Sequence, residues 1–238
     1  RAAAYRAPGS PMAAFAVESL IDEICTDLNL DPIDVRLKNA VKEGDKSSYG
    51  PKFKKIGLIE TLEATKDHPN YSISLGDNQG RGVAAGYWMN HGGETSVSVS
   101  LAEDGSVNVT VGTPDIGGSR ASIALMTAET YGIPYNSVRV NIAETGALGF
   151  NEPTHGSRAT LASGKAVYEA ANQTISEMCR RVAKKWQIDP DAVFWDNGYA
   201  KPAGPNAGDF SPISIKQIAS EMDQTGGPIA GHHEASIR

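Results

Sequence analysis

The sequence has few cysteines and no long apolar run, and each shortage excludes a class of protein. Only two cysteines occur, Cys25 and Cys179, and neither has a second cysteine at metal-ligand spacing. Zinc and iron–sulfur sites built on cysteine pairs are therefore not expected. Both cysteines lie in helical patterns, which favours buried free thiols, although a disulfide between them stays open. No apolar run approaches the roughly 20 residues of a membrane span, so we expect no membrane-spanning segment.

Positive charge is also scarce. The chain has 22 Lys and Arg residues against 28 Asp and Glu residues, a formal net charge of -6. An acidic chain without a basic stripe is poorly suited to bind phosphates of nucleic acids, so we expect no nucleic-acid partner. The first residue is Arg1 and no signal-like segment follows, so we expect any targeting segment to lie upstream. The compartment stays open, with the cytoplasm favoured over the periplasm.

The character of the sequence changes near Gly76. Before it, Ser10-Pro11 and Asp31-Pro32 each join a helix-capping residue to a proline at the first helical position, and helical periodicity follows both. After it, residues 95–101 and 107–111 alternate strictly around the turn Asp104-Gly105, which predicts a β-hairpin. Other expected helices span residues 56–66, 120–131, 161–186 and 213–222, and other expected strands span 80–88, 138–142, 194–202 (a pair) and 228–238. This order predicts an α+β fold, a mostly antiparallel sheet with packed helices, and subdomains at 1–75 and 76–238.

Two glycine–serine segments lead into predicted helices. The first contains Gly117, Gly118 and Ser119, the second contains Gly156 and Ser157, and an arginine follows each. A helix start carries unpaired N–H donors and partial positive charge, which suit phosphate. Two such segments indicate a ligand with several phosphates or a long polar outline. Taken alone, each is better explained as ordinary helix capping, and neither matches a Walker A or G-x-G-x-x-G pattern.

The histidines give no metal or catalytic pattern. His91, His155, His232 and His233 do not stand at metal-ligand spacing along a helix, and lone loop histidines are usually surface or hydrogen-bonding residues. No metal site and no Ser/His/Asp or Cys/His arrangement is predicted.

Six ordered motifs resemble the molybdopterin-binding large subunit of the molybdenum hydroxylases, the xanthine dehydrogenase, aldehyde oxidase and CO dehydrogenase family. Residues 4–11 resemble A-[FY]-R-G-x-G-x-P, and residues 31–39 resemble D-P-[IL]-x-[VL]-R-x-x-N. The remaining motifs are Gly80–Ala84, Asp104–Val107 with Gly112–Gly117, Gly132–Pro134, and Gly156–Thr160 with Gly164–Val167.

The resemblance implies an oxidoreductase that hydroxylates an aldehyde or N-heterocycle carbon with oxygen from water. Its cofactor would be molybdenum on molybdopterin, in the cytosine dinucleotide form. Electrons would leave through [2Fe–2S] clusters and FAD on partner subunits, and the chain would be a fragment that also needs the rest of the molybdenum subunit. Residues 1–75 would end a first molybdopterin-binding subdomain and include a helical linker, and residues 76–238 would form an incomplete second one.

The resemblance also assigns site residues by position. Arg6 and Ala7 would lie beside the molybdenum ligands, and Ala85, Gly86, Tyr87 and Trp88 would line the substrate approach. Gly117, Gly118, Ser119, Gly156 and Ser157 would hold the pterin or its phosphates. The catalytic residue stays unknown, because the family's glutamate belongs to a later G-x-G-E segment that these residues do not include. The fragment alone is therefore expected to be inactive.

Two departures from the family pattern keep alternatives open. Gly118 stands where relatives often carry glutamine, so a side-chain bond to the cofactor is lost or replaced, and Ala7 replaces the copper-binding cysteine of carbon monoxide dehydrogenases, which argues against carbon monoxide as substrate. The first alternative is a cofactor-free or degenerate structural domain of the same fold. The second is a nucleotide-phosphate-binding α+β domain unrelated to molybdenum.

Overall fold

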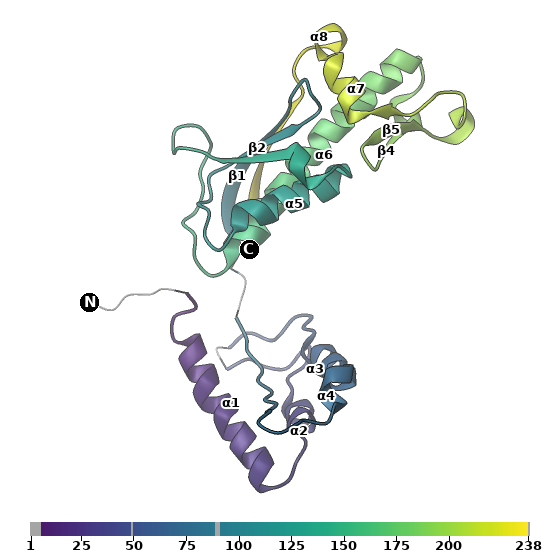
Figure 1. Ribbon diagram of the computed structural model, residues 1–238. Coiled ribbons are helices and arrows are strands. Elements are labelled where there is room, and N and C mark those ends of the chain that lie inside the picture. Colours follow the sequence, from purple (N-terminus) through teal and green to yellow (C-terminus); the bar gives the residue numbers. More distant parts are fainter. Residues whose placement is uncertain (1–5, 49, 89–90, 238) are drawn as a thin grey trace. The chain divides into compact units, whose positions relative to one another are not determined.

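The computed structural model describes residues 6–48, 50–88 and 91–237, and the chain divides into two compact units, residues 1–88 and 89–238 (Figure 1). This division lies after the segment Gly80–Trp88, whereas the sequence predicts a boundary at residue 76. The assignment of residues 1–75 and 76–238 to two molybdopterin-binding subdomains stays a prediction.

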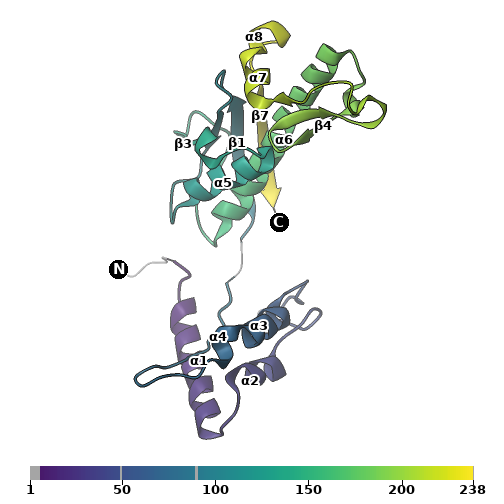
Figure 2. The same ribbon diagram turned by 45° about the vertical axis from the view of Figure 1, so that its right-hand side comes forward.

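Unit 1 is helical, as the proline signals indicated. The expected helices are confirmed, and a short fourth helix follows them: α1 (Ser10–Asp27), α2 (Pro32–Asn39), α3 (Leu58–Asp67) and α4 (Pro69–Ser72) (Figure 2). Asp31 caps α2, because its Oδ1 accepts hydrogen bonds from the backbone N–H groups of Ile33 and Asp34, each at 2.9 Å. The capping geometry explains why Asp-Pro starts a helix at this position.

The strand predicted for residues 80–88 is wrong. The segment has no regular secondary structure. Side chains from the helices satisfy its backbone in place of a neighbouring strand: the carbonyl of Val83 accepts from Arg36 at 2.7 Å, and the N–H of Ala85 donates to Glu18 at 2.7 Å. The segment is rich in glycine and alanine and therefore offers little side-chain area for packing in a sheet.

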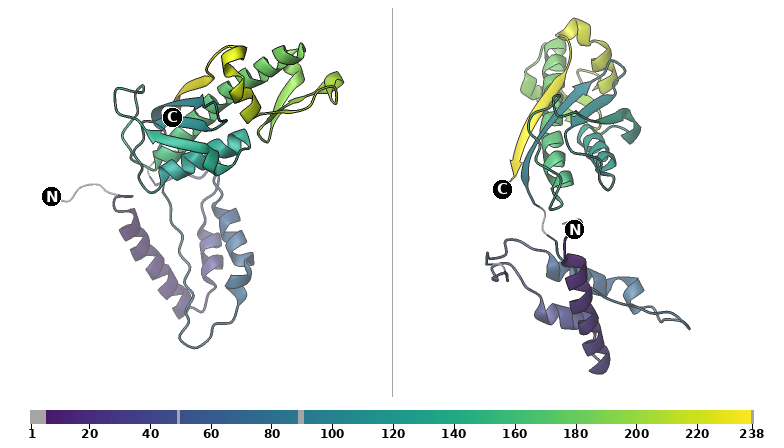
Figure 3. Two further views of the ribbon diagram at one scale, coloured as in Figure 1. Left: turned by 45° about the horizontal axis from the view of Figure 1, so that its top comes forward. Right: turned by 90° about the vertical axis from the view of Figure 1, so that its left-hand side faces the viewer.

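Unit 2 is built on a four-stranded sheet in the order β3-β2-β1-β7. Its strands are β1 (Gly93–Leu101), β2 (Val107–Val111), β3 (Val138–Ile142) and β7 (Ala230–Ile237). The hairpin β1–β2 is confirmed, and β7 pairs antiparallel with β1 along its whole length (Figure 3). The pair β2–β3 is parallel, since α5 (Ser119–Tyr131) connects the two strands. The α+β class with a mostly antiparallel sheet is therefore confirmed.

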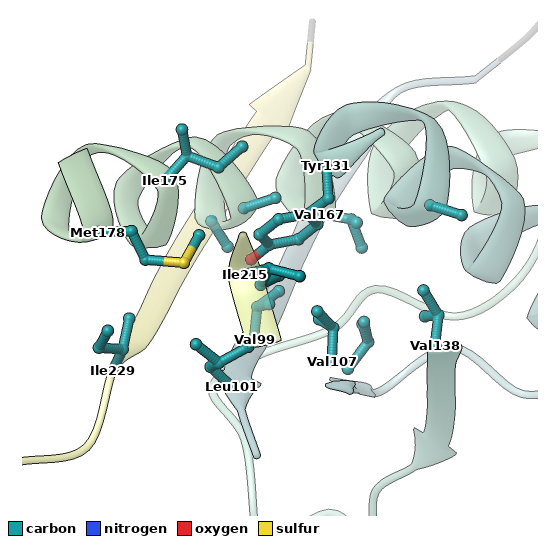
Figure 4. Close-up of a cluster of buried hydrophobic side chains, with 14 of the residues drawn as sticks. Val99, Leu101, Val107, Tyr131, Val138, Val167, Ile175, Met178, Ile215 and Ile229 are labelled. Carbon is teal, nitrogen blue, oxygen red and sulfur yellow. The ribbon is translucent and has the colours of Figure 1, made fainter. Parts of the chain in front are cut away.

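Helices α5 and α6 (Arg158–Trp186) pack on one face of this sheet. The alternating valines of β1 and β2 point toward the helices, which is why Val97, Val99, Val107 and Val109 are at most 1% exposed. Figure 4 shows this core, in which side chains of α5, α6 and the sheet meet. The apolar face of β1–β2 thus fixes where the two long helices lie.

A smaller antiparallel sheet, β4-β5-β6, lies beside the far part of α6. It contains β4 (Val193–Asp196) and β5 (Tyr199–Pro202), the expected strand pair, and β6 (Ile213–Ser214). The helix expected at 213–222 instead begins as β6 and continues as α7 (Ile215–Ser220) and α8 (Met222–Thr225), because Ser214 and Gln217 form a capping box that starts α7.

Two further findings concern the whole described chain. Cys25 and Cys179 are buried free thiols, so the two cysteines do not form a disulfide. Among the described residues, none of the helices combines the length and the apolar character that a membrane crossing requires.

Candidate functional site

Both glycine–serine segments follow strands that run parallel to each other. The first loop (residues 112–118) leaves the end of β2 after Val111, and the second loop (residues 143–157) leaves the end of β3 after Ile142. Val111 and Ile142 are register partners, and the N–H of Ala143 donates to the carbonyl of Val111 at 2.8 Å. Both loops therefore start side by side at the carboxyl ends of parallel strands, the usual position of ligand sites in such sheets.

The helices that follow the loops also run parallel. The side chain of Met126 in α5 lies against Gly164 in α6, and further along both helices the hydroxyl of Tyr131 bonds to that of Thr174. Contacts that advance in the same direction along both chains require parallel axes, which Figure 1 also shows. The N-termini of α5 and α6 consequently lie at the same end of unit 2.

The first loop offers a ligand mainly its backbone N–H groups and few side-chain donors. Gly117 and Gly118 are exposed, and within the described part of the chain their N–H groups donate no hydrogen bond. The hydroxyl of Ser119 is buried and donates to Pro114, so it fixes the loop. Gly118 has a φ of 80° and borders a hollow of about 330 Å³ beside α5 and β3.

The arginine of the first loop is already paired. The backbone N–H of Arg120 donates to Asp115 at 3.0 Å, and its guanidinium lies 3.3 Å from the same carboxylate. Asp115 therefore caps α5 and neutralises Arg120. What this loop offers an anion is the pair of glycine N–H groups.

The second loop is fastened from within by Arg158. This arginine is fully buried and donates to the carbonyls of Gly92 (2.8 Å), Glu152 (2.8 Å) and Glu94 (2.5 Å). Arg158 is therefore a structural residue, whose guanidinium holds the loop and does not face solvent. The side chain of Ser157, by contrast, is exposed at the start of α6.

Gly156 permits a close approach of two segments. Its φ is 56°, a Cβ there would collide with the side chain of His91, and its carbonyl accepts the N–H of His91 at 2.6 Å. Nearby, the hydroxyl of Thr154 is buried and has no hydrogen-bond partner among the described residues. Buried polar atoms without a hydrogen-bond partner are unusual in folded proteins, and a bound ligand could supply the partner that this hydroxyl lacks.

A buried network of hydroxyl groups connects the first loop, near its start at the end of β2, to the second loop. Ser163 in α6 contacts Thr113 of the first loop at 2.7 Å and Thr95 of β1 at 3.4 Å. Thr95 in turn donates to Asn151 of the second loop at 2.6 Å. Asn151 and Gly112 border a second hollow of about 400 Å³. The network holds both loops in one arrangement.

The remaining predicted site residues lie in unit 1. Arg6 and Ala7 both have left-handed backbone, with φ of 51° and 49°. The N–H of Ser10 donates to the carbonyl of Ala7, and the hydroxyl of Ser10 donates to the carbonyl of Tyr87 at 3.4 Å. The structure thus brings the start of α1 next to the segment Ala85–Trp88. The predicted residues form two groups, one in each unit.

One cluster of side chains was not predicted from the sequence. His91, Glu152 and His155 come together at the second loop, with their possible ligand atoms all within 4.8 Å of one another. The pKa of Glu152 is lowered, chiefly by its hydrogen bond with His155. The E-x-x-H spacing of Glu152 and His155 was a signal in the sequence, but His91 is distant along the chain and only the fold brings it near.

Comparisons with known proteins identify the family of this chain. The sequence model of a molybdopterin cofactor-binding domain matches residues 58–236, and a second model with the same description matches residues 1–40. The putative xanthine dehydrogenase molybdenum-binding subunit XdhA of Escherichia coli (strain K12) is 32% identical over 186 residues, which are 71% of this chain and 25% of that protein. The nicotine 6-hydroxylase large subunit of Paenarthrobacter nicotinovorans is 23% identical over 91% of this chain and 29% of its own length.

A solved structure agrees at the level of fold. Quinoline 2-oxidoreductase from Pseudomonas putida 86 superposes with a TM-score of 0.71 at 17% identity, over 94% of this chain and 32% of that one. The chain spans between a quarter and a third of the length of the relatives described here. On the strength of the match to residues 58–236, the chain belongs to the molybdopterin cofactor-binding domain family, in the group that includes the molybdenum-binding subunits of xanthine dehydrogenases.

Proposed function

We propose that this chain forms part of the molybdenum-cofactor site of an oxidoreductase that hydroxylates an aldehyde or N-heterocycle carbon with oxygen from water. The observation that carries the proposal is the shared origin of the two loops at the paired ends of β2 and β3. Their free N–H groups open at the same end of unit 2, and relatives with this domain are named as molybdenum-binding subunits and hydroxylases.

The residues present fit a phosphorylated pterin. The N–H groups of Gly117 and Gly118 and the exposed hydroxyl of Ser157 are hydrogen-bond donors suited to phosphate or pterin oxygens. Gly156 and the backbone around Ser119 complete the proposed contacts, and the unpartnered hydroxyl of Thr154 is a further candidate. We infer the cytosine dinucleotide form, which the resemblance to the molybdenum hydroxylases implies; two separate loops suit the long polar outline of a dinucleotide.

The bound cofactor would supply the oxygen-transfer and electron-accepting chemistry, while the protein positions it and excludes competing reactions. The resemblance implies that Arg6 and Ala7 of unit 1 would lie beside the molybdenum ligands. The segment Ala85–Trp88 would line the substrate approach, since Ser10 fixes it beside the left-handed turn at these two residues. Ala7 disfavours carbon monoxide as the substrate.

We infer that the working enzyme contains further subunits or domains. Electrons from the oxidised substrate need acceptors, and we propose [2Fe–2S] clusters and FAD on partners of this chain. The name of the nicotine 6-hydroxylase relative describes a large subunit, which supports an assembly of several chains. The remainder of the molybdenum subunit would complete the cofactor site and would carry the glutamate that acts as the base.

Replacing Gly118 by aspartate tests the proposal. We would purify the protein that carries this chain from its native host, measure molybdenum per mole and analyse the nucleotide released by acid. Wild type should contain molybdenum and release a cytidine nucleotide. Gly118→Asp places a carboxylate among the N–H groups that are proposed to bind the cofactor phosphates. The repulsion between this carboxylate and a phosphate should cost more than about 1.4 kcal/mol, which lowers the molybdenum content at least about tenfold.

Gly208→Asp is the matched control. Gly208 also has positive φ (95°), and a side chain there would meet nothing within 4 Å, as at Gly118. This variant should retain wild-type molybdenum. A wild-type protein that is active without molybdenum and pterin would overturn the proposal, and one that is folded but inactive without them would support the cofactor-free structural domain. Equal molybdenum in both variants would remove the first loop from the cofactor site.

A further inference from the structure

We propose that His91, Glu152 and His155 form a binding site for a divalent transition-metal ion, of which Zn²⁺ is the best match. Two imidazoles and one carboxylate are a common ligand set for such ions. The site lies wholly within unit 2 and does not depend on the proposed cofactor function.

The three side chains converge on one carboxylate oxygen. Glu152 Oε1 lies 3.0 Å from His155 Nε2 and 3.8 Å from His91 Nε2, and the two imidazole centroids are 4.7 Å apart. Ligand atoms around a tetrahedral zinc ion are about 3.3 Å apart, given metal–ligand distances near 2.0–2.1 Å. The observed spacing therefore needs only small side-chain rotations to enclose an ion.

The other carboxylate oxygen is held away from the imidazoles. Glu152 Oε2 accepts the N–H of Glu94 at 3.2 Å and lies 4.0 Å from the guanidinium of Arg158. These contacts orient the carboxylate so that Oε1 faces the histidines. Such supporting bonds are typical of metal ligands, because they fix the direction of the donor atom.

The backbone beneath the cluster is fastened at each ligand. The N–H of His91 donates to Gly156, next to His155, and the N–H of Glu152 donates to Glu94 at 3.0 Å. Arg158 holds the carbonyl of Glu152 from inside. The ligands thus start from fixed positions, which lowers the ordering cost of binding.

The absence of a side chain at two glycines provides the space in which His91 and Glu152 lie. A Cβ at Gly93, which has a φ of 90°, would collide with the carboxylate of Glu152, and a Cβ at Gly156 would collide with His91. The side chains of His91 and His155 are 50% and 48% exposed, and that of Glu152 is 26% exposed. An ion can therefore enter from solvent and keep water as a further ligand.

The test uses the full 238-residue chain, purified with chelator and then freed of it. Isothermal titration with ZnCl₂ at roughly pH 7.5, where free imidazole is mostly neutral, should give one site per chain. His91→Ala and His155→Ala should each weaken binding at least about 100-fold, because loss of a ligand exceeds the 10–100-fold cost of losing a supporting contact. Both side chains are half-exposed, so the variants should fold, as thermal unfolding without metal would verify.

His232→Ala is the control. His232 Nε2 lies 3.7 Å from Glu234, so it forms a similar histidine–glutamate pair without a second imidazole. Its loss should change the Kd less than about twofold. Co²⁺ substituted for Zn²⁺ should give a d–d spectrum without a thiolate band, because the cysteines are not ligands. Absence of binding in wild type, a thiolate band, or equal affinity in all three histidine variants would overturn the proposal.

Discussion

The guanidinium of Arg36 and the carboxylate of Glu18 form a buried ion pair in unit 1, with Nε and Oε2 2.8 Å apart. The side chains are 4% and 14% exposed. Arg36 also donates to the carbonyls of Pro32 and Val83, and Glu18 accepts the N–H of Ala85. The pair therefore joins α1 and α2 to the segment Gly80–Trp88. The arginine of the D-P-I-D-V-R motif thus has a structural role.

Arg36→Met should lower the free energy of unfolding of unit 1 by about 3–5 kcal/mol, because it removes the charged partner of the largely buried Glu18 carboxylate and the donor to the carbonyl of Val83. Urea unfolding measures the change. Arg81→Met is the control, since Arg81 is exposed, donates to Ile73 and lies over the ring of Tyr71. It should cost about 1 kcal/mol or less, and an equal loss in both variants would contradict the assignment.

Arg158→Met should destabilise unit 2 by about 3–5 kcal/mol, because three carbonyls at the second loop and the start of β1 lose a charged donor that is itself buried. Hydrogen exchange should show faster exchange at residues 92–94 and 152–156 than elsewhere in the unit. Arg180→Met, on the exposed face of the same helix, should cost less than about 1 kcal/mol. Unchanged exchange in the second loop would show that Arg158 does not hold it.

Glu177 should make unit 2 sensitive to acid. Arg180 first, and Arg181 with it, lower the pKa of Glu177 from an ordinary value near 4.5 to about 2. A carboxylate with a depressed folded-state pKa contributes stability above the unfolded pKa and loses it as the pH falls. The loss should therefore occur between about pH 4.5 and 2, and should amount to about 1–2 kcal/mol after solvent screening.

Glu177→Gln should flatten that part of the stability curve, which urea unfolding at several pH values would measure. The matched control is Glu169→Gln, on the same helix, whose carboxylate has no ion pair in the part of the chain that the structure describes. Curves of Glu177→Gln and wild type that stay parallel below pH 4.5 would refute the assignment.

Two glycines at the packing contacts of α6, Gly231 of β7 and Gly164 of α6 itself, should respond differently to substitution by alanine. A Cβ at Gly231 in β7 would press on the backbone carbonyl of Ala170, whereas a Cβ at Gly164 would meet only the flexible tip of Met126. Gly231→Ala should cost about 1–3 kcal/mol through overpacking. Gly164→Ala should stay within about 1 kcal/mol, because the gain in helix propensity offsets a shift of Met126. Thermal unfolding compares them, and a larger loss at Gly164 would contradict the packing described here.

The sequence predicts most elements of unit 2, because strict alternation in residues 95–111 and long helical periodicity are local signals. It does not predict that β2 and β3 run parallel, since that depends on α5 crossing between them. The parallel pair is what places the two loops side by side. The expectation that both loops bind one pterin cofactor comes from the family resemblance, because the residues of the loops alone do not identify a ligand.

The same distinction explains what the sequence alone does not predict at the site. Arg158 follows a glycine–serine turn in sequence, and no local pattern shows that its side chain points inward onto three carbonyls. The segment Gly80–Trp88 has the composition of a strand with small residues, yet helix side chains bind its backbone at Val83 and Ala85. His91 joins Glu152 only through the fold, so no local pattern could predict that cluster.

The pairing of β1 with β7 has a consequence for how unit 2 is made. β1 is the first strand of the unit to leave the ribosome, and the partner on its outer edge is the last. Until β7 emerges, that edge is open to pairing with other chains, and closing it brings together segments far apart in sequence, which slows folding. Synthesis of this domain therefore includes an interval in which β1 lacks its outer partner, and β7 then takes the edge position of the described sheet.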